Sequence, residues 1–153
     1  MSGAGAPKLA IDASGLQVAV LVTHWHANIT DGLLAGAERA LKAAGNTEYE
    51  IWRVPGAFEL PLAAKYAVEA GADVVIALGV VIRGNTPHFD YVCNAATDGL
   101  TRVQLDSGVP IGFGLLTVDT EQQALDRAGL PGSKEDKGAE AVEAAVLMAR
   151  LKA

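Results

Sequence analysis

The sequence predicts a three-layer α/β/α sandwich around a four-stranded parallel sheet. Four short apolar runs rich in β-branched residues are spaced along the chain, as expected of strands that are buried on both faces. Between them lie segments with apolar residues at helical spacing. Strands that alternate with helices form parallel βαβ units, and a chain of 153 residues fits one such domain.

The predicted strands cover residues 16–22, 49–54, 74–82 and 111–118. The third (VVIALGVVI) is the most hydrophobic segment, which favours a central place in the sheet. Residues 7–13 (PKLAIDA) lie outside the alternating pattern and are only weakly strand-like. We therefore divide the chain into an N-terminal arm, 1–15, and a single domain, 16–153. Because a four-stranded parallel sheet has exposed edges, the arm can pair with an edge of its own sheet or of a neighbouring subunit's sheet.

Five helices are predicted, at residues 29–44, at 59–70, from Pro87 onward, at 121–128 and at 137–151. Asn28 can cap the first helix and Gly45 can end it. Pro61 falls in the first turn of the second helix, where its missing N–H costs nothing. Thr86 is the predicted cap of the third helix, with Pro87 at its first position.

Composition excludes several classes of function. The net charge is −6 and no run of Lys or Arg occurs, so nucleic acid and anionic membranes are not expected as partners. Cys93 is the only cysteine, which excludes a disulfide framework or a cysteine-based zinc site within the chain. No apolar run approaches transmembrane length, and residues 1–15 lack the apolar core of a signal peptide. We therefore expect a cytoplasmic protein.

Residues suited to binding and chemistry follow three of the predicted strands. The three connections are 24–26 (HWH), 56–59 (GAFE) and 83–88 (RGNTPH). Ligands of open α/β sheets bind outside the carboxyl ends of the strands. We therefore expect these connections to face one rim of the sheet and to form a site there.

The third connection admits two interpretations. Gly84 lets the backbone approach a ligand, and the N–H groups of Asn85 and Thr86 would point outward at the start of a helix, where phosphate is attracted. Alternatively, these residues simply cap a helix. His88, in the first turn of that helix, is a candidate acid or base that stays neutral near physiological pH because the helix dipole disfavours its imidazolium form. A structural histidine is the alternative, and both questions stay open from these residues alone.

Other rim residues also have two interpretations. Trp25 and Phe58 are either core residues or aromatic walls for a planar heterocycle. Glu59 is either a first-turn acid favoured by the helix dipole or an acceptor for hydroxyl groups. Arg127, near the end of a short helix, is favoured there as a cation, and its functional interpretation is a bidentate phosphate clamp. No third ligand joins the two histidines that flank Trp25, so no metal site is predicted. Three other cations are interpreted as solvated or structurally paired, unless a neighbouring subunit brings one of them to the rim: Arg83, Lys134 and Lys137.

Four segments, in order, closely resemble the lumazine synthase family: VPGAFELP, ALGVVIRGNTPHFDYV, PIGFGLLTVDTEQQALDRAG and DKGAEA. The similarity covers nearly the whole chain from Leu16 onward. That family makes 6,7-dimethyl-8-ribityllumazine in the penultimate step of riboflavin biosynthesis. The resemblance implies a flavodoxin-like fold and favours the catalytic interpretation of His88.

The resemblance also implies a reaction. The family condenses 5-amino-6-(D-ribitylamino)uracil with L-3,4-dihydroxy-2-butanone 4-phosphate. An amine and a ketone form an imine, phosphate is eliminated, and the ring closes with loss of water. None of these steps is a redox step, so no flavin, nicotinamide or metal cofactor is implied. Proximity and proton transfer remain, which suit a site with one histidine and no nucleophile.

The resemblance further implies the role of each site residue. His88 transfers protons, and Trp25 stacks on the pyrimidine. The ribityl chain is lined by three residues, of which the last accepts hydroxyl hydrogen bonds: Ala57, Phe58 and Glu59. Backbone groups that meet the ring belong to Val80, Val81 and Ile82. The phosphate is held by Gly84, Asn85, Thr86 and Arg127. Two residues resemble those that an adjacent subunit contributes, so that each site would straddle an interface: Phe113 and Lys137.

The sequence departs from the family pattern at one position and leaves two other hypotheses to weigh. Many relatives have Asn after the aromatic residue, whereas here His26 follows Trp25, and we assign His26 no role. One competing hypothesis is a non-catalytic protein of the same fold that binds a lumazine or a flavin. The other is a purely structural shell protein. Neither needs to keep His88, residues 84–86 and Arg127 together, and since all are present we favour the enzyme.

The resemblance implies a homo-oligomer built on a ring of five chains. Some relatives stop at the ring and others pack twelve rings into an icosahedral shell, a choice that tracks the turn between the last two helices. Here the turn at residues 130–136 (LPGSKED) is long and contains Pro131. Proline fixes φ and prevents simple continuation of the preceding helix, so the last helix should leave at a different angle. We therefore predict a free pentamer rather than a shell.

Overall fold

The structure is a computed structural model that describes residue 5 and residues 10–152. Its four strands are all parallel and lie in the order β2-β1-β3-β4. Their bounds are β1 (Val18–Thr23), β2 (Glu50–Val54), β3 (Val74–Ile82) and β4 (Ile111–Val118). The helices are α1 (Ala27–Ala43), a 3₁₀ turn η2 (Ala57–Glu59), α2 (Leu60–Glu69), α3 (His88–Ser107), α4 (Glu121–Leu125) and α5 (Lys137–Leu151). The four strands and five helices predicted for residues 16–153 are all present.

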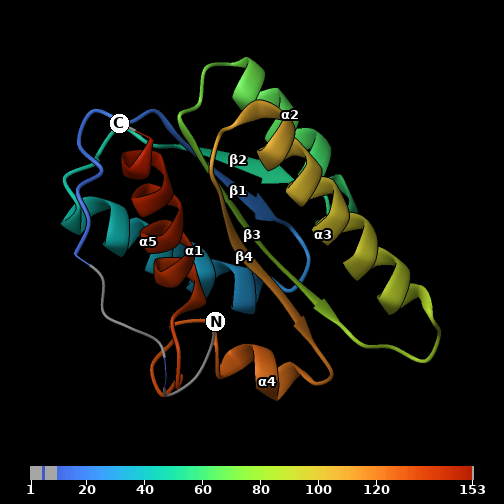
Figure 1. The fold of residues 1–153 in the computed structure, drawn as a ribbon. Coiled ribbons are helices and arrows are strands. Elements are labelled where there is room, and N and C mark those ends of the chain that lie inside the picture. Colours follow the sequence, from blue (N-terminus) through green and yellow to red (C-terminus); the bar gives the residue numbers. More distant parts are fainter. Residues whose placement is uncertain (1–4, 6–9, 153) are drawn as a thin grey trace.

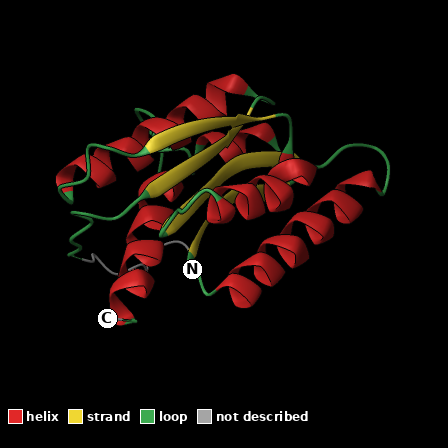
Figure 2. Cartoon of the chain, turned by 90° about the horizontal axis from the view of Figure 1, so that it is seen from above, coloured by secondary structure: helices red, strands yellow, loops and turns green. Residues whose placement is uncertain are grey.

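Helices cover both faces of the sheet (Figures 1 and 2). Alternate residues of β1 point to opposite faces, as the pleat requires. Val20 and Val22 join the core beneath α1 and α5, whereas Ala19 and Leu21 join the core beneath α2 and α3. The three-layer, flavodoxin-like sandwich predicted from the sequence is confirmed. Of the helices in the described ranges, none is both long enough and apolar enough to cross a membrane.

The start of α1 differs from the prediction. The helix begins at Ala27, and its N-cap is His26, with φ 56° and ψ 62°. Asn28 is therefore not the cap, and its Nδ2 instead donates to Oε1 of Glu121 at 3.2 Å. The helix can begin earlier than predicted because a left-handed residue turns the chain sharply after β1. Gly45, with φ +83°, follows the helix end as predicted.

Other boundaries also shift by a few residues, including the start of β1, which is Val18 instead of residue 16. A 3₁₀ turn precedes α2, which still has Pro61 in its first turn. The first residue of α3 is His88 and its N-cap is Pro87, one residue later than predicted. Thr86 nevertheless accepts from the His88 N–H at 3.4 Å. α4 ends at Leu125 instead of residue 128, because the chain folds back there into the turn before α5.

Part of the predicted N-terminal arm lies against its own domain. Residues 10–13 are not a strand, and Ala13 is completely buried in the core. The N–H of Ala13 donates to the carbonyl of Ala44 at 2.9 Å, and Arg150 of α5 donates to the carbonyls of Asp12 and Ser14. The weak strand predicted over residues 7–13 is therefore wrong for 10–13, while residues 7–9 lie outside the described residues. Pairing of the arm with a neighbour stays a prediction.

The turn between α4 and α5 is closely packed against α1. The N–H groups of Lys134 and Glu135 both donate to the carbonyl of Asp126, at 2.8 and 2.9 Å. Asp136 caps α5 through the N–H of Ala139 at 3.1 Å and pairs with Arg39 of α1 at 3.0 Å. The long turn predicted from the sequence is thus held in place by backbone hydrogen bonds and by an ion pair to another helix.

Glycines allow α1 and α5 to approach each other closely. A Cβ at Gly138 would lie 2.0 Å from the carbonyl oxygen of Leu33, and one at Gly36 would lie 2.1 Å from Oδ1 of Asp136. Neither distance leaves room for a methyl group, so a larger residue at Gly138 would force the two helix backbones apart, and one at Gly36 would displace the Asp136 side chain.

Gly138→Ala should lower the free energy of unfolding by about 1–3 kcal/mol, the usual cost of an extra methyl group in a packed interior. The new Cβ would collide with the α1 backbone, which cannot move aside as a flexible side chain can. Urea unfolding at a fixed chain concentration measures the effect. Gly84→Ala is the matched control, since a Cβ there meets no atom within 4 Å. Equal stability of the two variants would contradict the close packing.

Candidate active site

A pocket of about 600 Å³ lies at the carboxyl ends of the strands. All three connections predicted to meet at this rim contribute to it, together with the end of β3 and the first turns of α3. Its lining residues are Trp25, His26, Gly56, Ala57, Phe58, Glu59, Val80, Val81, Ile82, His88 and Val92. The prediction that these connections share one rim is confirmed.

The floor of the pocket is the end of β3. Pairing of β3 with β1 stops at Leu78, whereas pairing with β4 continues to Ile82. The backbone of residues 80–82 therefore has a strand partner on the β4 side only. Because backbone N–H and C=O groups require partners, this edge can offer hydrogen bonds to a flat polar ring.

Two aromatic side chains flank the pocket from outside the core. Trp25 is 67% exposed and Phe58 is 64% exposed, so the interpretation of both as core residues is wrong. The indole of Trp25 lies against the backbone of Gly56, where an added Cβ would come within 3.3 Å of its Cδ1 and Nε1 atoms. The remaining interpretation is that these rings hold a planar ligand.

Glu59 and His88 are the predicted site residues that line the pocket with ionisable side chains. Glu59 ends the turn η2, where its N–H donates to the carbonyl of Gly56 at 3.2 Å. His88 is the first residue of α3, a helix of 20 residues. His88 therefore lies at the N-terminus of this helix and lines the pocket from there. One hydrogen-bond acceptor and one candidate proton carrier thus line the same pocket.

Arg83 organises the loop between β3 and α3. Its Nε donates to Oδ1 of Asp119 at 2.7 Å, its Nη1 lies 3.5 Å from Oδ1 of Asp90, and its guanidinium stacks 4.4 Å from the centre of the Phe89 ring. The hydrogen bond to Asp119 is the main cause of the raised pKa of Arg83. The prediction that Arg83 is structurally paired is confirmed.

The residues predicted to hold phosphate are exposed but lie beyond the pocket lining. Gly84, Asn85 and Thr86 follow Arg83 in the same loop. An added Cβ at Gly84 would meet nothing within 4 Å, so there is open space around the backbone. The loop therefore leaves room for a ligand beside the N-terminus of α3.

Three other predicted site residues do not line the pocket of their own chain. Nη1 of Arg127 donates to the carbonyl of Gln123 at 2.8 Å, and the carbonyl of Arg127 accepts from the N–H of Lys137 at 3.0 Å. The ammonium of Lys137 pairs with Glu135 at 3.2 Å and with Glu140 at 3.1 Å. Phe113 lies on the edge strand β4. Arg127 is thus grouped with Lys137 rather than with residues 84–86 of the same chain.

Three lining residues were not predicted as site residues: His26, Gly56 and Val92. Gly56 is next to the predicted Ala57, and Val92 is one helical turn after His88, so local spacing could have found both.

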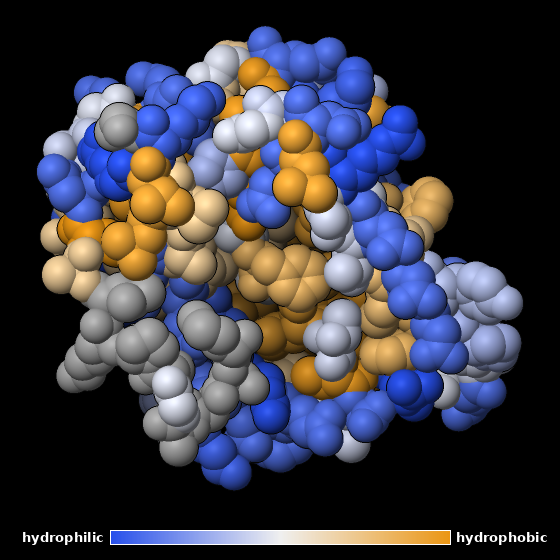
Figure 3. All heavy atoms as spheres, in the orientation of Figure 1, coloured by the Kyte–Doolittle hydropathy of each residue, from blue (hydrophilic) through white to orange (hydrophobic). Residues whose placement is uncertain are grey.

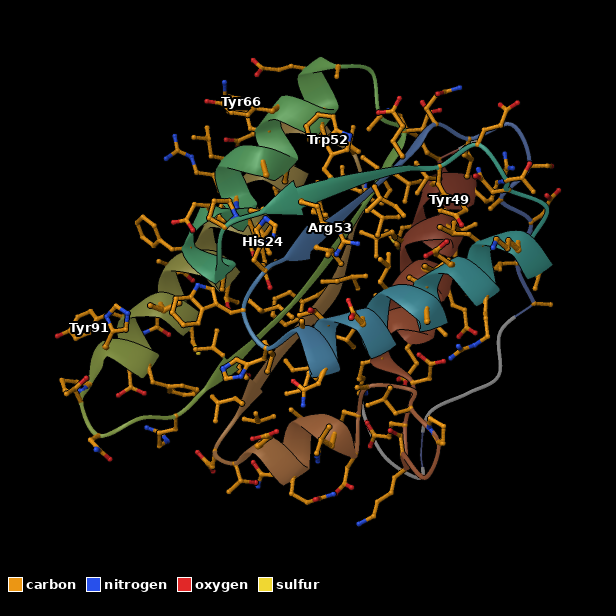
Figure 4. The ribbon with its side chains drawn as sticks, turned by 180° about the vertical axis from the view of Figure 1, so that it is seen from behind. His24, Tyr49, Trp52, Arg53, Tyr66 and Tyr91 are labelled. Carbon is orange, nitrogen blue, oxygen red and sulfur yellow. The ribbon has the colours of Figure 1, made fainter. Side chains whose placement is uncertain are left out.

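His24 continues the pairing of β1 with β2, because its N–H donates to the carbonyl of Val54 at 3.0 Å, and it lies near Arg53 (Figure 4). Within the described part of the chain, no three His, Cys, Asp or Glu side chains are grouped to hold a metal.

Two unlike apolar surfaces lie along the two edges of the sheet. The β4 surface consists of exposed Phe113 on β4 and of a shallow groove lined by Leu105, Met148 and Leu151; Figure 3 shows apolar atoms gathered at the centre of this face. The β2 surface includes Trp52, Leu62 and Tyr66, which line a shallow groove with Phe58, and Figure 4 shows Trp52 and Tyr66 on neighbouring elements. Phe58 lines both this groove and the main pocket, so the pocket opens toward the β2 edge.

The chain is similar to known proteins along nearly its whole length. Residues 15–153 match the model of the family described as 6,7-dimethyl-8-ribityllumazine synthase. The protein of that name from Kineococcus radiotolerans is 67% identical over 146 residues, which cover 95% of this chain and 91% of the relative. That from Leifsonia xyli subsp. xyli is 64% identical over 151 residues, with 97% and 95% covered. That from Streptomyces coelicolor is 58% identical over 150 residues, with 97% and 93% covered.

Proposed function

Because the chain belongs to the 6,7-dimethyl-8-ribityllumazine synthase family, we propose that the pocket at the rim of the sheet is where lumazine is formed. The chain is an enzyme of riboflavin biosynthesis, a transferase that condenses 5-amino-6-(D-ribitylamino)uracil with L-3,4-dihydroxy-2-butanone 4-phosphate. The observation that supports the site is that aromatic, acidic and imidazole side chains from three separate connections line one pocket. A binding protein without catalysis is not favoured.

The pyrimidine lies between the aromatic walls and the end of β3. Trp25 stacks on the ring, a role supported by its exposed indole at the pocket. The open backbone edge of residues 80–82 provides donors and acceptors for the polar atoms of the ring. The ribityl chain runs along residues 57–59, where the Glu59 carboxylate accepts hydrogen bonds from its hydroxyls. These contacts orient the reacting amine toward His88.

The phosphate of the second substrate lies beside the loop before α3. Unpaired N–H groups and the dipole at a helix start favour a dianion, and the loop has open space at Gly84. Asp90, in the first turn of α3, would repel the dianion. Its pairing with Arg83 reduces that repulsion. Residues 84–86 therefore contribute backbone donors, while Arg83 balances the nearby carboxylates.

His88 moves protons between the two substrates. Imine formation requires the amine to lose protons and the ketone oxygen to leave as water. Elimination of phosphate then removes a proton from carbon, and ring closure releases a second water. An imidazole between the pyrimidine and the phosphate loop can accept and return these protons. Holding both substrates in one pocket contributes the larger part of the acceleration.

A second copy of the chain completes the site. Arg127 and Lys137 lie together, outside the pocket of their own chain, and Phe113 lies on the β4 surface. The pocket opens toward the opposite edge, at β2. Two unlike surfaces that bind each other form a head-to-tail ring rather than a two-fold dimer. One copy then supplies Phe113, from its β4 surface, and Arg127 and Lys137, from the two ends of the segment that joins α4 to α5, to the pocket of the next. Arg127 reaches the phosphate in this way.

The cytoplasmic location stays a prediction.

His88→Ala should lower turnover by roughly 100-fold or less, because proximity still operates and solvent can carry protons. The assay mixes both substrates and follows lumazine absorbance and released phosphate. His24→Ala is the matched control, since His24 lies at the same rim outside the pocket lining, and its turnover should stay unchanged. Unchanged turnover of His88→Ala would remove this residue from the mechanism, and a wild-type protein that makes no lumazine would overturn the proposed function.

Arg127→Ala should raise the KM for the butanone phosphate by about 10- to 100-fold, the usual cost of a lost charge-assisted hydrogen bond. The KM for the pyrimidine should change far less, because only the butanone carries a dianion. Arg102→Ala is the control, an exposed arginine that pairs with Asp106 on α3. Equal weakening of both substrates would show that Arg127 has a structural role.

The oligomer should be a free pentamer of five 15.8 kDa chains, or about 79 kDa. The prediction depends on the turn at residues 130–136, which sets where α5 begins and which is fixed to α1 through Asp136 and Arg39. Sedimentation velocity or native mass spectrometry measures the particle. A mass near one megadalton would mean that rings assemble into a shell and that our interpretation of this turn is wrong.

A further inference from the structure

His26 has an unusual backbone conformation. Among the residues that the structure describes, it is the only residue other than glycine with a positive φ, at 56°. Left-handed backbone is disfavoured for L-residues that carry a Cβ. His26 is also the N-cap of α1, a position that normally has extended backbone. An uncommon conformation at a functional pocket suggests that the conformation itself has a function.

The hydrogen bonds of the helix do not explain this conformation, although the Thr30 hydroxyl also donates to the His26 carbonyl, at 3.4 Å. The side chain of His26 makes no capping hydrogen bond. Its carbonyl accepts from the N–H groups of Ile29 at 2.9 Å and Thr30 at 3.0 Å, which the carbonyl of any ordinary N-cap residue would also do. The reason for the left-handed turn must therefore lie outside the helix.

Trp25, the residue before His26, supplies that reason. Thr23, at the end of β1, is almost completely buried, and α1 begins only four residues later. Within this short connection Trp25 is 67% exposed. Its ring centre lies 6.5 Å from that of His26, and the two planes are inclined by 45°. The sharp turn at His26 lets the chain enter the helix at once while the indole stays out at the pocket.

Gly56 supports the indole from the other side. A Cβ at this position would come within 3.3 Å of the indole and 3.2 Å of Oε1 of Glu59. The connection after β2 is therefore shaped to receive the Trp25 ring against its backbone. The left-handed turn on one strand connection and the glycine on the next together determine where the ring lies.

We propose that His26 is a positioning residue that acts through its backbone. Its left-handed conformation holds Trp25 against Gly56, in the orientation that stacks on the pyrimidine substrate. The inference rests on the proposed role of Trp25 in binding that substrate. It assigns the imidazole of His26 no chemical step.

Three substitutions separate the backbone of His26 from its side chain. Asn and Gly both tolerate left-handed backbone, so His26→Asn and His26→Gly remove the imidazole and keep the turn. Val is β-branched and is strongly disfavoured there, so His26→Val removes both. If only the fraction of molecules with a correctly placed ring can bind, His26→Val should raise the KM for the pyrimidine by about 5- to 30-fold. His26→Asn and His26→Gly should stay within about twofold of the wild type. The KM for the butanone phosphate should barely change in any of them.

Fluorescence gives a second measurement that is independent of catalysis. The chain has two tryptophans, so a Trp52→Phe background reports Trp25 alone. Acrylamide quenching in this background should be the same with His26 and with His26→Asn, and should differ with His26→Val. Circular dichroism at a fixed chain concentration confirms that each variant is folded. If His26→Val does not fold, the comparison of His26→Gly with Gly56→Ala replaces it, because the second displaces the ring without altering residue 26.

Two results would overturn the proposal. One is a KM for the pyrimidine that rises as much in His26→Asn and His26→Gly as in His26→Val, which would assign the effect to the imidazole. The other is unchanged KM and unchanged quenching in folded His26→Val or, failing that, in Gly56→Ala. The proposed function fails in a different way, through a wild-type protein that forms no lumazine, and the quenching experiment still reports the position of Trp25 in that case.

Discussion

The unequal pairing of β3 is the constraint on which the site depends. β3 is hydrogen-bonded to β4 through Ile82 but to β1 only through Leu78, because β1 ends at Thr23 and the chain turns away into α1. The extra length of β3 therefore extends past its neighbour and becomes the floor of a pocket. Trp25, on the connection that leaves β1, and Glu59, on the connection that leaves β2, close the pocket above that floor. A shorter β3, or a longer β1, would fill this space with ordinary sheet.

Close backbone packing also fixes the positions of a second group of residues, Arg127 and Lys137. Gly36 and Gly138 let α1, α5 and the turn before α5 approach one another closely, and Asp136 joins all three through its cap and its pair with Arg39. Arg127 and Lys137 lie on this rigid unit, away from the pocket. The chain therefore holds two groups of predicted site residues in two separate places, each held by its own packing.

The sequence predicted the fold well because its strongest signals are local. The apolar runs of β3 and β4 gave their bounds, and the carboxyl-end rule brought three connections to one rim. The start of α1 could not be predicted, because an Asn before an apolar stripe favours a cap at Asn28, while a left-handed His26 depends on where β2 and its loop lie. Two further features could not be predicted: the exposure of Trp25 and Phe58, and the position of Arg127 away from the pocket. Both depend on contacts between segments that are distant in the sequence.

In the proposed head-to-tail ring, the position of Arg127 and Lys137 outside the pocket of their own chain links the chemistry to the concentration of the chain. The pocket of an isolated folded chain would hold Trp25, Glu59 and His88, but would lack the two cations of a neighbour. Dilution below the chain concentration at which the copies associate would then lower the activity without unfolding any strand or helix. A newly made chain would likewise bind the butanone phosphate weakly until it met others, so in the proposed ring the condensation would become efficient only after assembly.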